Sequence, residues 1–196
     1  MRKTQIAKQE RNAQIVHTIV EATKPLIEQE GYENLTIRDI CTNAGITTGM
    51  FYRHFVSKDD VLTFCYMQDL KEVLSNIDEK LAQLSLPEQL VTLMVTVLSI
   101  NRKFGPASVY MFINRNTAST SGSFQMRGML KEKILELIDT AVSNGYQLSD
   151  DRTPDKIFND ISTIAKGLTS DWYMTGFVDI ADHAQDLFGR IIPHLL

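Results

Sequence analysis

The segment from Thr36 to Lys58 constrains the fold more than any other part of this chain. Its sequence is TIRDICTNAGITTGMFYRHFVSK. Thr36 followed three residues later by Asp39 is the pattern of a capping box at a helix start. Gly45 then suits the left-handed residue that ends a helix, and Thr47 or Thr48 can cap the next one. Two short helices joined by a glycine-containing turn predict a helix-turn-helix, whose second helix enters the major groove of DNA.

The expected second helix carries an unusual number of groups that can contact DNA. Hydrogen-bond donors stand at Thr47, Thr48, Tyr52, His54 and Lys58. Gly49 removes bulk where a backbone could approach DNA closely. Ser57 and Asp60 form a further capping pattern, and the free N–H groups of such a helix start favour a phosphate. A small helical subdomain with a solvated polar face remains an alternative interpretation of this spacing.

The same segment resembles the signature of TetR-family transcriptional regulators. The resemblance rests on Ala-Gly-Ile-Thr at 44–47 and on Tyr-x-His-Phe-x-Ser-Lys at 52–58, and it covers about the first 60 residues. It implies phosphate contacts by Thr36, Tyr52, His54 and Lys58, and base contacts by Arg38, Thr47, Thr48, Gly49 and Met50. It also implies a homodimer on a palindromic operator, repression by occlusion, and release by a small-molecule effector.

The charge distribution is compatible with a locally basic DNA-binding head. The formal net charge is −4. Residues 1–60 carry eight basic and eight acidic side chains, whereas residues 61–196 carry twelve and sixteen. The whole negative excess therefore follows the helix-turn-helix, and DNA contact has to rely on a local patch. The residues before about Asn12 are expected to be a disordered tail, with a DNA-contacting arm as the alternative.

Hydrophobic periodicity predicts an all-α chain of about nine helices, with no strand. A three-helix DNA-binding domain is expected at residues 1–57 and a larger ligand-binding and dimerisation domain at 58–196. A first helix from Asn12 to Glu30 contains Pro25, where we expect a bend or an irregular turn. Later helices are expected at 58–84, from Pro87 to Ile100, at 107–116, at 124–144, at 154–176 and at 180–195, with a loop at 118–123.

The last expected helix carries a wide apolar face. This face is either part of the core of one chain, or the last two helices of each of two chains pack into a two-fold four-helix bundle. A dimer is favoured because one recognition helix reads few bases, whereas two reach successive half-sites. The expected interface residues are Ile161, Leu168, Ala184, Leu187, Phe188 and Ile191.

An effector pocket is expected in the second domain. The candidates are aromatic, methionine and polar residues at helical spacing: Tyr66, Met94, Phe104, Tyr110, Phe112, Asn114, Arg115, Met129, Trp172 and Tyr173. Such residues also build ordinary helical cores. Asn114 and Arg115 can orient a polar or anionic ligand, but a cationic ligand fits the sequence equally well.

Other function classes have less support in the sequence. The four histidines are scattered, no paired Glu-x-x-His motif occurs, and no P-loop, Gly-x-Ser-x-Gly or Cys-x-x-Cys is present. We therefore expect no enzyme, no metal and no cofactor. A helix-turn-helix protein that organises DNA, or a repressor without a ligand, remains an alternative.

The expected location is the cytoplasm. No early apolar run resembles a signal peptide, and no stretch of about 18 apolar residues could span a bilayer. Cys41 and Cys65 are spaced like neither a metal site nor a redox pair. Buried reduced thiols are the favoured interpretation, with a redox sensor as the alternative.

Overall fold

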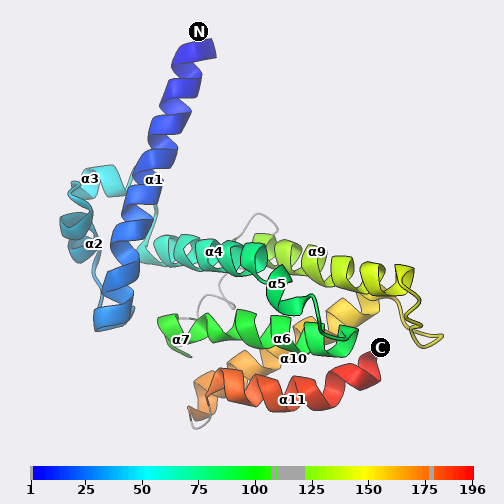
Figure 1. Ribbon diagram of the computed structural model, residues 1–196. Coiled ribbons are helices and arrows are strands. Elements are labelled where there is room, and N and C mark those ends of the chain that lie inside the picture. Colours follow the sequence, from blue (N-terminus) through cyan, green and yellow to red (C-terminus); the bar gives the residue numbers. More distant parts are fainter. Residues whose placement is uncertain (1, 107–108, 110–121, 177–178) are drawn as a thin grey trace. The chain divides into compact units, whose positions relative to one another are not determined.

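The computed structural model describes residues 2–106, 109, 122–176 and 179–196 (Figure 1). Every regular element within these ranges is a helix, so the predicted all-α fold is confirmed. The chain divides into two compact units, Met1–Gln68 and Asp69–Leu196. The first unit contains the predicted DNA-binding head and also the first half of helix α4 (Lys58–Asn76).

The first unit consists of α1 (Arg2–Glu30), α2 (Ile37–Ala44), α3 (Thr48–Phe51) and the beginning of α4. Helix α2 packs against α1, and the side-chain amide of Asn43 donates to the carbonyl oxygen of Ala22 at 2.7 Å. The core of this unit is formed by Ile19, Val20, Ile27, Leu35, Ile40, Phe51, Phe55, Val61, Leu62 and Cys65, all of which are buried. This apolar core fixes the short helices, which would not be stable alone.

Helix α1 differs from its expected form. It begins at Arg2 rather than near Asn12, so the segment expected to be a disordered tail is the first part of the helix. The helix continues through Pro25, so of the two expected effects the irregular turn is wrong, and the bend stays a prediction. Pro25 is exposed, so the carbonyl of Glu21, which loses its backbone donor, can bond to water.

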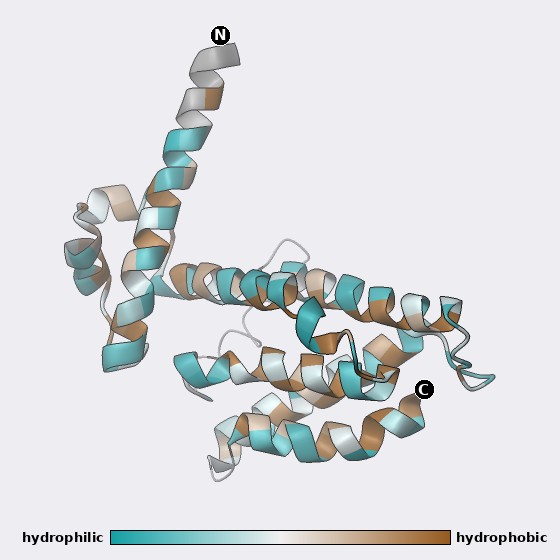
Figure 2. Ribbon diagram, in the orientation of Figure 1, coloured by the Kyte–Doolittle hydropathy of each residue, from teal (hydrophilic) through white to brown (hydrophobic). Residues whose placement is uncertain are grey.

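The second unit is organised around α6 (Leu86–Ser99), which packs against α9 (Gly122–Ser143) and most extensively against α11 (Ile180–Leu195). Helix α10 (Pro154–Thr175) packs on both α9 and α11. Leu90, Leu93 and Met94 of α6 are fully buried, as expected for its nearly continuous apolar sequence. Hydrophobic and hydrophilic residues alternate along α11, as Figure 2 shows, which is the pattern of a helix with one face in the core.

The helix expected from residue 58 to about 84 is divided in two. Helix α4 ends at Asn76, and α5 (Asp78–Leu81) follows after Ile77. The side-chain amide of Asn76 donates to the carbonyl oxygen of Glu72 at 2.9 Å, and such a bond competes with the backbone ladder at a helix end. Ile77 is buried.

The remaining expected boundaries are close to the observed ones. Helix α7 (Asn101–Phe104) follows α6, and Gly105 ends it with φ of 79°. The expected helix at 107–116 lies outside the described residues except for residue 109, and of the expected loop at 118–123, residues 122 and 123 begin α9. Within the described ranges, no helix has the length and apolar character needed to cross a bilayer.

Candidate nucleic-acid interface and effector site

The turn between α2 and α3 is built as the sequence predicts. Gly45 adopts φ of 64°, a left-handed conformation that costs glycine little. Its N–H donates to the carbonyl oxygen of Thr42 at 3.3 Å, and the N–H of Ile46 donates to that of Cys41 at 3.0 Å. These two bonds satisfy carbonyl groups at the end of α2, and they set the direction in which the chain enters α3.

The start of α2 is held by a complete capping box. The N–H of Asp39 donates to the hydroxyl oxygen of Thr36 at 3.2 Å, and the N–H of Thr36 donates to the carboxylate of Asp39 at 2.9 Å. Hydrogen bonds from the Thr36 hydroxyl and from its N–H lower the pKa of the Asp39 carboxyl. Thr36 and the neighbouring Arg38 are both exposed, so either can reach a ligand outside the head.

Helix α3 presents a polar surface of small residues. Thr47 caps it, accepting a hydrogen bond from the N–H of Met50 at 3.2 Å. Thr47, Thr48 and Gly49 are exposed and Met50 is half-buried. A Cβ added at Gly49 would meet nothing nearer than the Thr47 hydroxyl oxygen at 3.9 Å. The head's own packing therefore does not require glycine at this position.

Aromatic side chains pack against the buried side of α3. Phe51 and Phe55 are buried, with ring centroids 5.6 Å apart. The Phe64 ring of α4 meets Phe55 edge to face at 5.3 Å. Tyr52 packs its ring edge to face on Phe51 at 5.5 Å and remains 59% exposed. Its ring is thus supported on one side, and its phenol is available to an external partner.

Lys58 is engaged by the head itself. Its ammonium donates to the carbonyl oxygens of Tyr32, Glu33 and Leu35 at 3.2, 3.2 and 3.0 Å, and it lies 4.6 Å from the centroid of the Tyr32 ring. An ammonium group has three donors, and three carbonyl groups receive them. In this arrangement Lys58 fastens the start of α4 to the segment between α1 and α2.

The first turn of α4 has the predicted cap. The N–H groups of Val56 and Ser57 donate to the Asp60 carboxylate at 2.8 and 3.2 Å, and the N–H of Asp60 donates to the Ser57 hydroxyl at 3.3 Å. The Tyr32 hydroxyl donates to Asp59. Sequence reasoning found the Ser57–Asp60 pair from its spacing but missed the contacts of Tyr32 with Asp59 and Lys58, because these residues lie far apart in the sequence.

The candidate DNA-binding residues thus lie on α2, α3 and the segment that follows α3. Most of them are exposed: Thr36, Arg38, Thr47, Thr48, Gly49 and Tyr52. Met50, His54 and Lys58 are partly buried. An exposed row of hydroxyl and guanidinium donors on a rigid aromatic base can contact the phosphates and base edges of a duplex.

The structure describes six of the ten predicted effector-pocket residues, and these six differ in burial and in the unit to which they belong. Met94 and Phe104 are buried core residues, whereas Tyr173 is 44% exposed. Tyr66 and Trp172 are partly exposed, and Tyr66 belongs to the first unit. Met129 lines a groove of about 480 Å³ together with residues of α4 and α9. Tyr110, Phe112, Asn114 and Arg115 lie outside the described residues.

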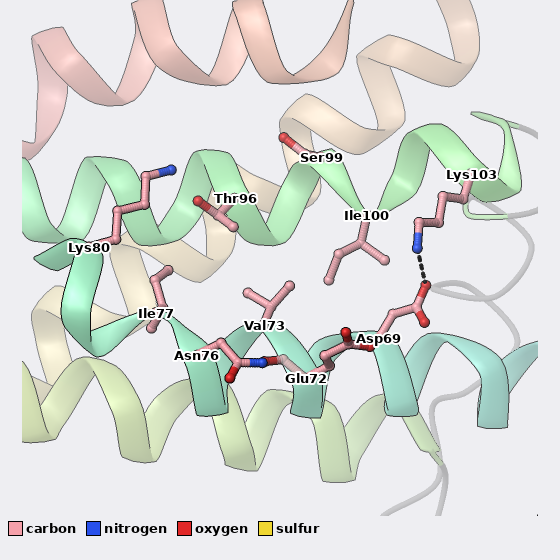
Figure 3. A pocket seen from close by; sticks show the side chains of 10 residues that line it. All are labelled: Asp69, Glu72, Val73, Asn76, Ile77, Lys80, Thr96, Ser99, Ile100 and Lys103. Atoms are coloured by element: carbon pink, nitrogen blue, oxygen red, sulfur yellow. Dashed lines mark hydrogen bonds and ion pairs between the residues drawn. The ribbon is translucent and has the colours of Figure 1, made fainter.

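A second groove lies between α4, α5, α6 and α7, and we call it the α4–α6 groove (Figure 3). Its volume of about 430 Å³ is that of a small-ligand site. Val73 and Ile77 extend from one side and Ile100 from the other, and Asp69 and Lys103 pair at one end (Figure 3). Among the described residues, the lining of this groove includes no member of the predicted pocket.

Four of the six predicted interface residues are core residues of the single chain. Ile161, Leu168, Ala184 and Phe188 are at most 3% exposed, because α10 and α11 pack against each other and onto neighbouring helices. Leu187 and Ile191 remain partly exposed. An apolar helix face can be covered by other helices of the same chain, and the prediction that these four buried residues form an interface did not take this into account.

Accessible residues form a row along each of α10 and α11. The row on α10 consists of Ile164, Gly167 and Asp171, and the row on α11 consists of His183, Leu187 and Ile191, each at helical spacing. The Nδ1 atom of His183 lies 3.8 Å from the Asp171 carboxylate, so the two rows meet at this pair. We call this surface the α10–α11 face.

Comparisons with known proteins agree with this geometry. The family model described as "Bacterial regulatory proteins, tetR family" matches residues 19–63. The HTH-type transcriptional regulator UidR of Escherichia coli K12 is 22% identical over 145 residues, covering 74% of this chain and 70% of that protein.

Two solved structures share the fold along most of their lengths. The transcriptional regulator FadR from Bacillus subtilis, in complex with stearoyl-CoA, has a TM-score of 0.64 at 13% identity, covering 90% of this chain and 96% of that one. A regulator described as putative from Saccharomonospora viridis, in complex with choline, has a TM-score of 0.64 at 21% identity, covering 93% and 97%.

Proposed function

We propose that this chain, which belongs to the tetR family of bacterial regulatory proteins and is a helix-turn-helix transcriptional regulator, represses transcription by occupying a palindromic operator as a homodimer. The observation that carries the proposal is the exposed row of Thr36, Arg38, Thr47, Thr48 and Tyr52 on a head with a buried apolar core, in which Phe51 and Phe55 lie next to α3. This row can face a major groove without any rearrangement of the head's core.

The roles within the row follow from chemistry and exposure. Tyr52 contacts a phosphate through its hydroxyl group, and His54 is a second candidate for such a contact. The Thr36 hydroxyl donates its only proton to the Asp39 carboxylate, so it reaches a phosphate only by giving up that bond. Arg38, Thr47, Thr48 and Met50 face base edges, where a guanidinium group can pair with guanine and a methyl group can contact thymine. Lys58 supports the head through its three carbonyl contacts, and its ammonium reaches a phosphate only by giving up some of them.

The α10–α11 face supports the homodimer. Its partly exposed apolar residues, Ile164, Leu187 and Ile191, alternate with small or polar ones, and two such helix pairs can form a four-helix bundle about a two-fold axis. Two heads related by that axis would read two half-sites of opposite direction. A palindromic operator is the expected consequence.

Release by a small molecule completes the proposal. FadR of B. subtilis and the S. viridis regulator are described in complex with stearoyl-CoA and choline, and the α4–α6 groove offers this chain a site of suitable volume. Helix α4 carries groove residues, and its first turn also belongs to the head. A ligand that changes the conformation of α4 can therefore change the conformation of the head.

Selection of bound duplexes from a random DNA pool, at near-physiological salt, tests the proposal. We expect a palindrome with two fixed half-sites. A matched control is Thr48→Asp, which places a carboxylate on the exposed first turn of α3, where a helix tolerates it, and which should enrich no sequence. Enrichment of no sequence by the unaltered protein would contradict the proposal and favour a DNA-organising protein. An operator bound identically with every candidate effector would favour a repressor without a ligand.

A further inference from the structure

We propose that the α4–α6 groove binds an organic cation with a primary or secondary ammonium group and a short apolar chain. The proposal rests on the proposed function, since it assigns the chemical class of the effector. It starts from Asp69, which is 6% exposed although it is charged. A carboxylate is rarely this buried unless a cation accompanies it.

Lys103, a cation that pairs with Asp69, is only loosely held. Lys103 donates to the Asp69 carboxylate at 3.1 Å, yet its own side chain is 51% exposed. The stem of a lysine is flexible, and its ammonium is readily hydrated. The Lys103 ammonium can therefore move into water when a ligand ammonium takes its place beside Asp69, and the buried carboxylate stays paired throughout.

The polar groups of the groove favour a ligand that donates hydrogen bonds. The Thr96 and Ser99 hydroxyls both donate to carbonyl oxygens of their own helix, at 2.7 Å, so towards a ligand they can act only as acceptors. The Asn76 amide nitrogen donates to Glu72, which leaves the Asn76 amide oxygen as an acceptor. Glu72 adds a second carboxylate on the same helix. These acceptors and carboxylates lie on both walls, and besides Lys80 and Lys103 the described lining residues offer an anionic head group no charged donor.

The apolar residues of the groove determine the length and character of the chain attached to the ligand's ammonium group. Val73 and Ile77 face Ile100 across the groove, with the Asp69–Lys103 pair at one end and Lys80 at the other (Figure 3). From Asp69 to Asn76 the wall formed by α4 is roughly 10 Å long, at about 1.5 Å per helical residue. A hexyl chain fits such a wall, with its ammonium at Asp69.

A quaternary ammonium is disfavoured. Proteins commonly recognise such groups with aromatic side chains, and the described residues that line this groove include none. A quaternary group also has no N–H to offer to Thr96, Ser99 or Asn76. The groove therefore differs in chemistry from a site made for choline.

Calorimetric titration of the full chain, without DNA, tests the assignment. The probes are hexylammonium, hexan-1-ol, hexanoate and hexyltrimethylammonium, which share one chain and differ in the head group. We expect hexylammonium to bind at least tenfold more tightly than the other three. Equal or tighter binding of hexanoate or hexan-1-ol would overturn the assignment.

Two variants separate ligand binding from folding. Asp69→Asn and Lys103→Met both break the same ion pair. If this pair had only a structural role, the two variants would change the affinity for hexylammonium in the same direction. We expect Asp69→Asn to weaken hexylammonium binding at least tenfold, and Lys103→Met to strengthen it because the competing ammonium is gone. Changes in the same direction would overturn the proposal.

The effector role has its own readout. Hexylammonium added to the complex with the selected operator should weaken DNA binding of the unaltered protein but not of Asp69→Asn. Binding at the groove with no change in operator affinity would overturn the effector assignment while leaving DNA recognition intact. Failure of the DNA selection would instead contradict the proposed function, whatever the titration shows.

Discussion

The ammonium of Lys58 lies 4.6 Å from the centroid of the Tyr32 ring and donates to the carbonyl oxygen of the same residue at 3.2 Å. This contact joins residues 26 positions apart, one before α2 and one at the start of α4. It changes the role expected of Lys58 from binding a phosphate to holding the head together, and the two roles make different predictions.

Lys58→Met should lower the free energy of unfolding of the head by about 1–3 kcal/mol, because carbonyl groups lose hydrogen bonds from a charged donor. Thermal and denaturant unfolding measure this. Arg53→Met removes one exposed positive charge from the same head and should change stability by less than about 0.5 kcal/mol. An unchanged stability of Lys58→Met, with the salt slope of DNA binding reduced by about one, would restore the phosphate role.

Gly49→Ala should leave the fold intact and weaken operator binding at least about tenfold. The added Cβ meets only the Thr47 hydroxyl, at 3.9 Å, and alanine stabilises a helix by roughly 0.5–1 kcal/mol relative to glycine. Gly128→Ala in α9 is the matched control, since nothing lies within 4 Å of a Cβ built at that position. Equal operator affinity of both variants would mean that DNA does not approach Gly49.

Arg38→Ala and Tyr52→Phe should affect DNA binding in different ways. Loss of the guanidinium group should reduce discrimination at one base pair of each half-site by about 1–3 kcal/mol. Loss of the phenol should weaken binding to all sequences alike. Affinities for the operator and for its single-base variants measure both effects. A uniform loss in Arg38→Ala would show that Arg38 contacts the backbone.

Asp39→Asn should reduce stability in a pH-dependent way. The Asp39 pKa is lowered in the folded head, chiefly by the Thr36 hydroxyl. The carboxylate therefore stabilises the fold fully above its unfolded pKa of about 3.9, and this contribution disappears as pH falls through the lower folded pKa. The difference between the unaltered protein and Asp39→Asn should be constant from pH 7 to 5 and shrink below about pH 4.

Glu88→Gln is the control for the Asp39 variant. Glu88 forms an equivalent capping box with Ser85 in the second unit, and the Ser85 hydroxyl lowers its pKa. It should show the same acid dependence of stability with no change in operator affinity. If the stability difference for Asp39→Asn did not depend on pH, the capping carboxylate would not be the cause.

Ile191→Lys should dissociate the dimer. An ammonium on the α10–α11 face would be buried without a partner in each of two symmetric positions, which should raise the dissociation constant at least about a hundredfold. Gln185→Lys adds the same group at an exposed position of the same helix and should leave the dimer intact. Sedimentation equilibrium measures both. A dimer of unchanged strength in Ile191→Lys would place the interface elsewhere.

Sequence alone predicted the features that depend on neighbouring residues. The capping boxes of Thr36 and Ser57 and the left-handed Gly45 follow from short-range spacing, and all are present. The contacts of Lys58 and the Asp69–Lys103 pair join distant residues, so no local pattern indicated them. Likewise, the apolar spacing of Met94 and Phe188 indicated burial but not what would bury them, and both lie in the chain's own core.

The burial of the two native thiols makes the protein a convenient subject for site-directed labelling. Cys41 is 4% and Cys65 0% exposed, and burial raises the pKa of the Cys41 thiol, which lowers its thiolate fraction further. A cysteine introduced at an exposed position of the head, such as Arg53→Cys, should then react with a maleimide far faster than either. A spin label attached there would report the separation of two heads in a dimer without removing the native cysteines.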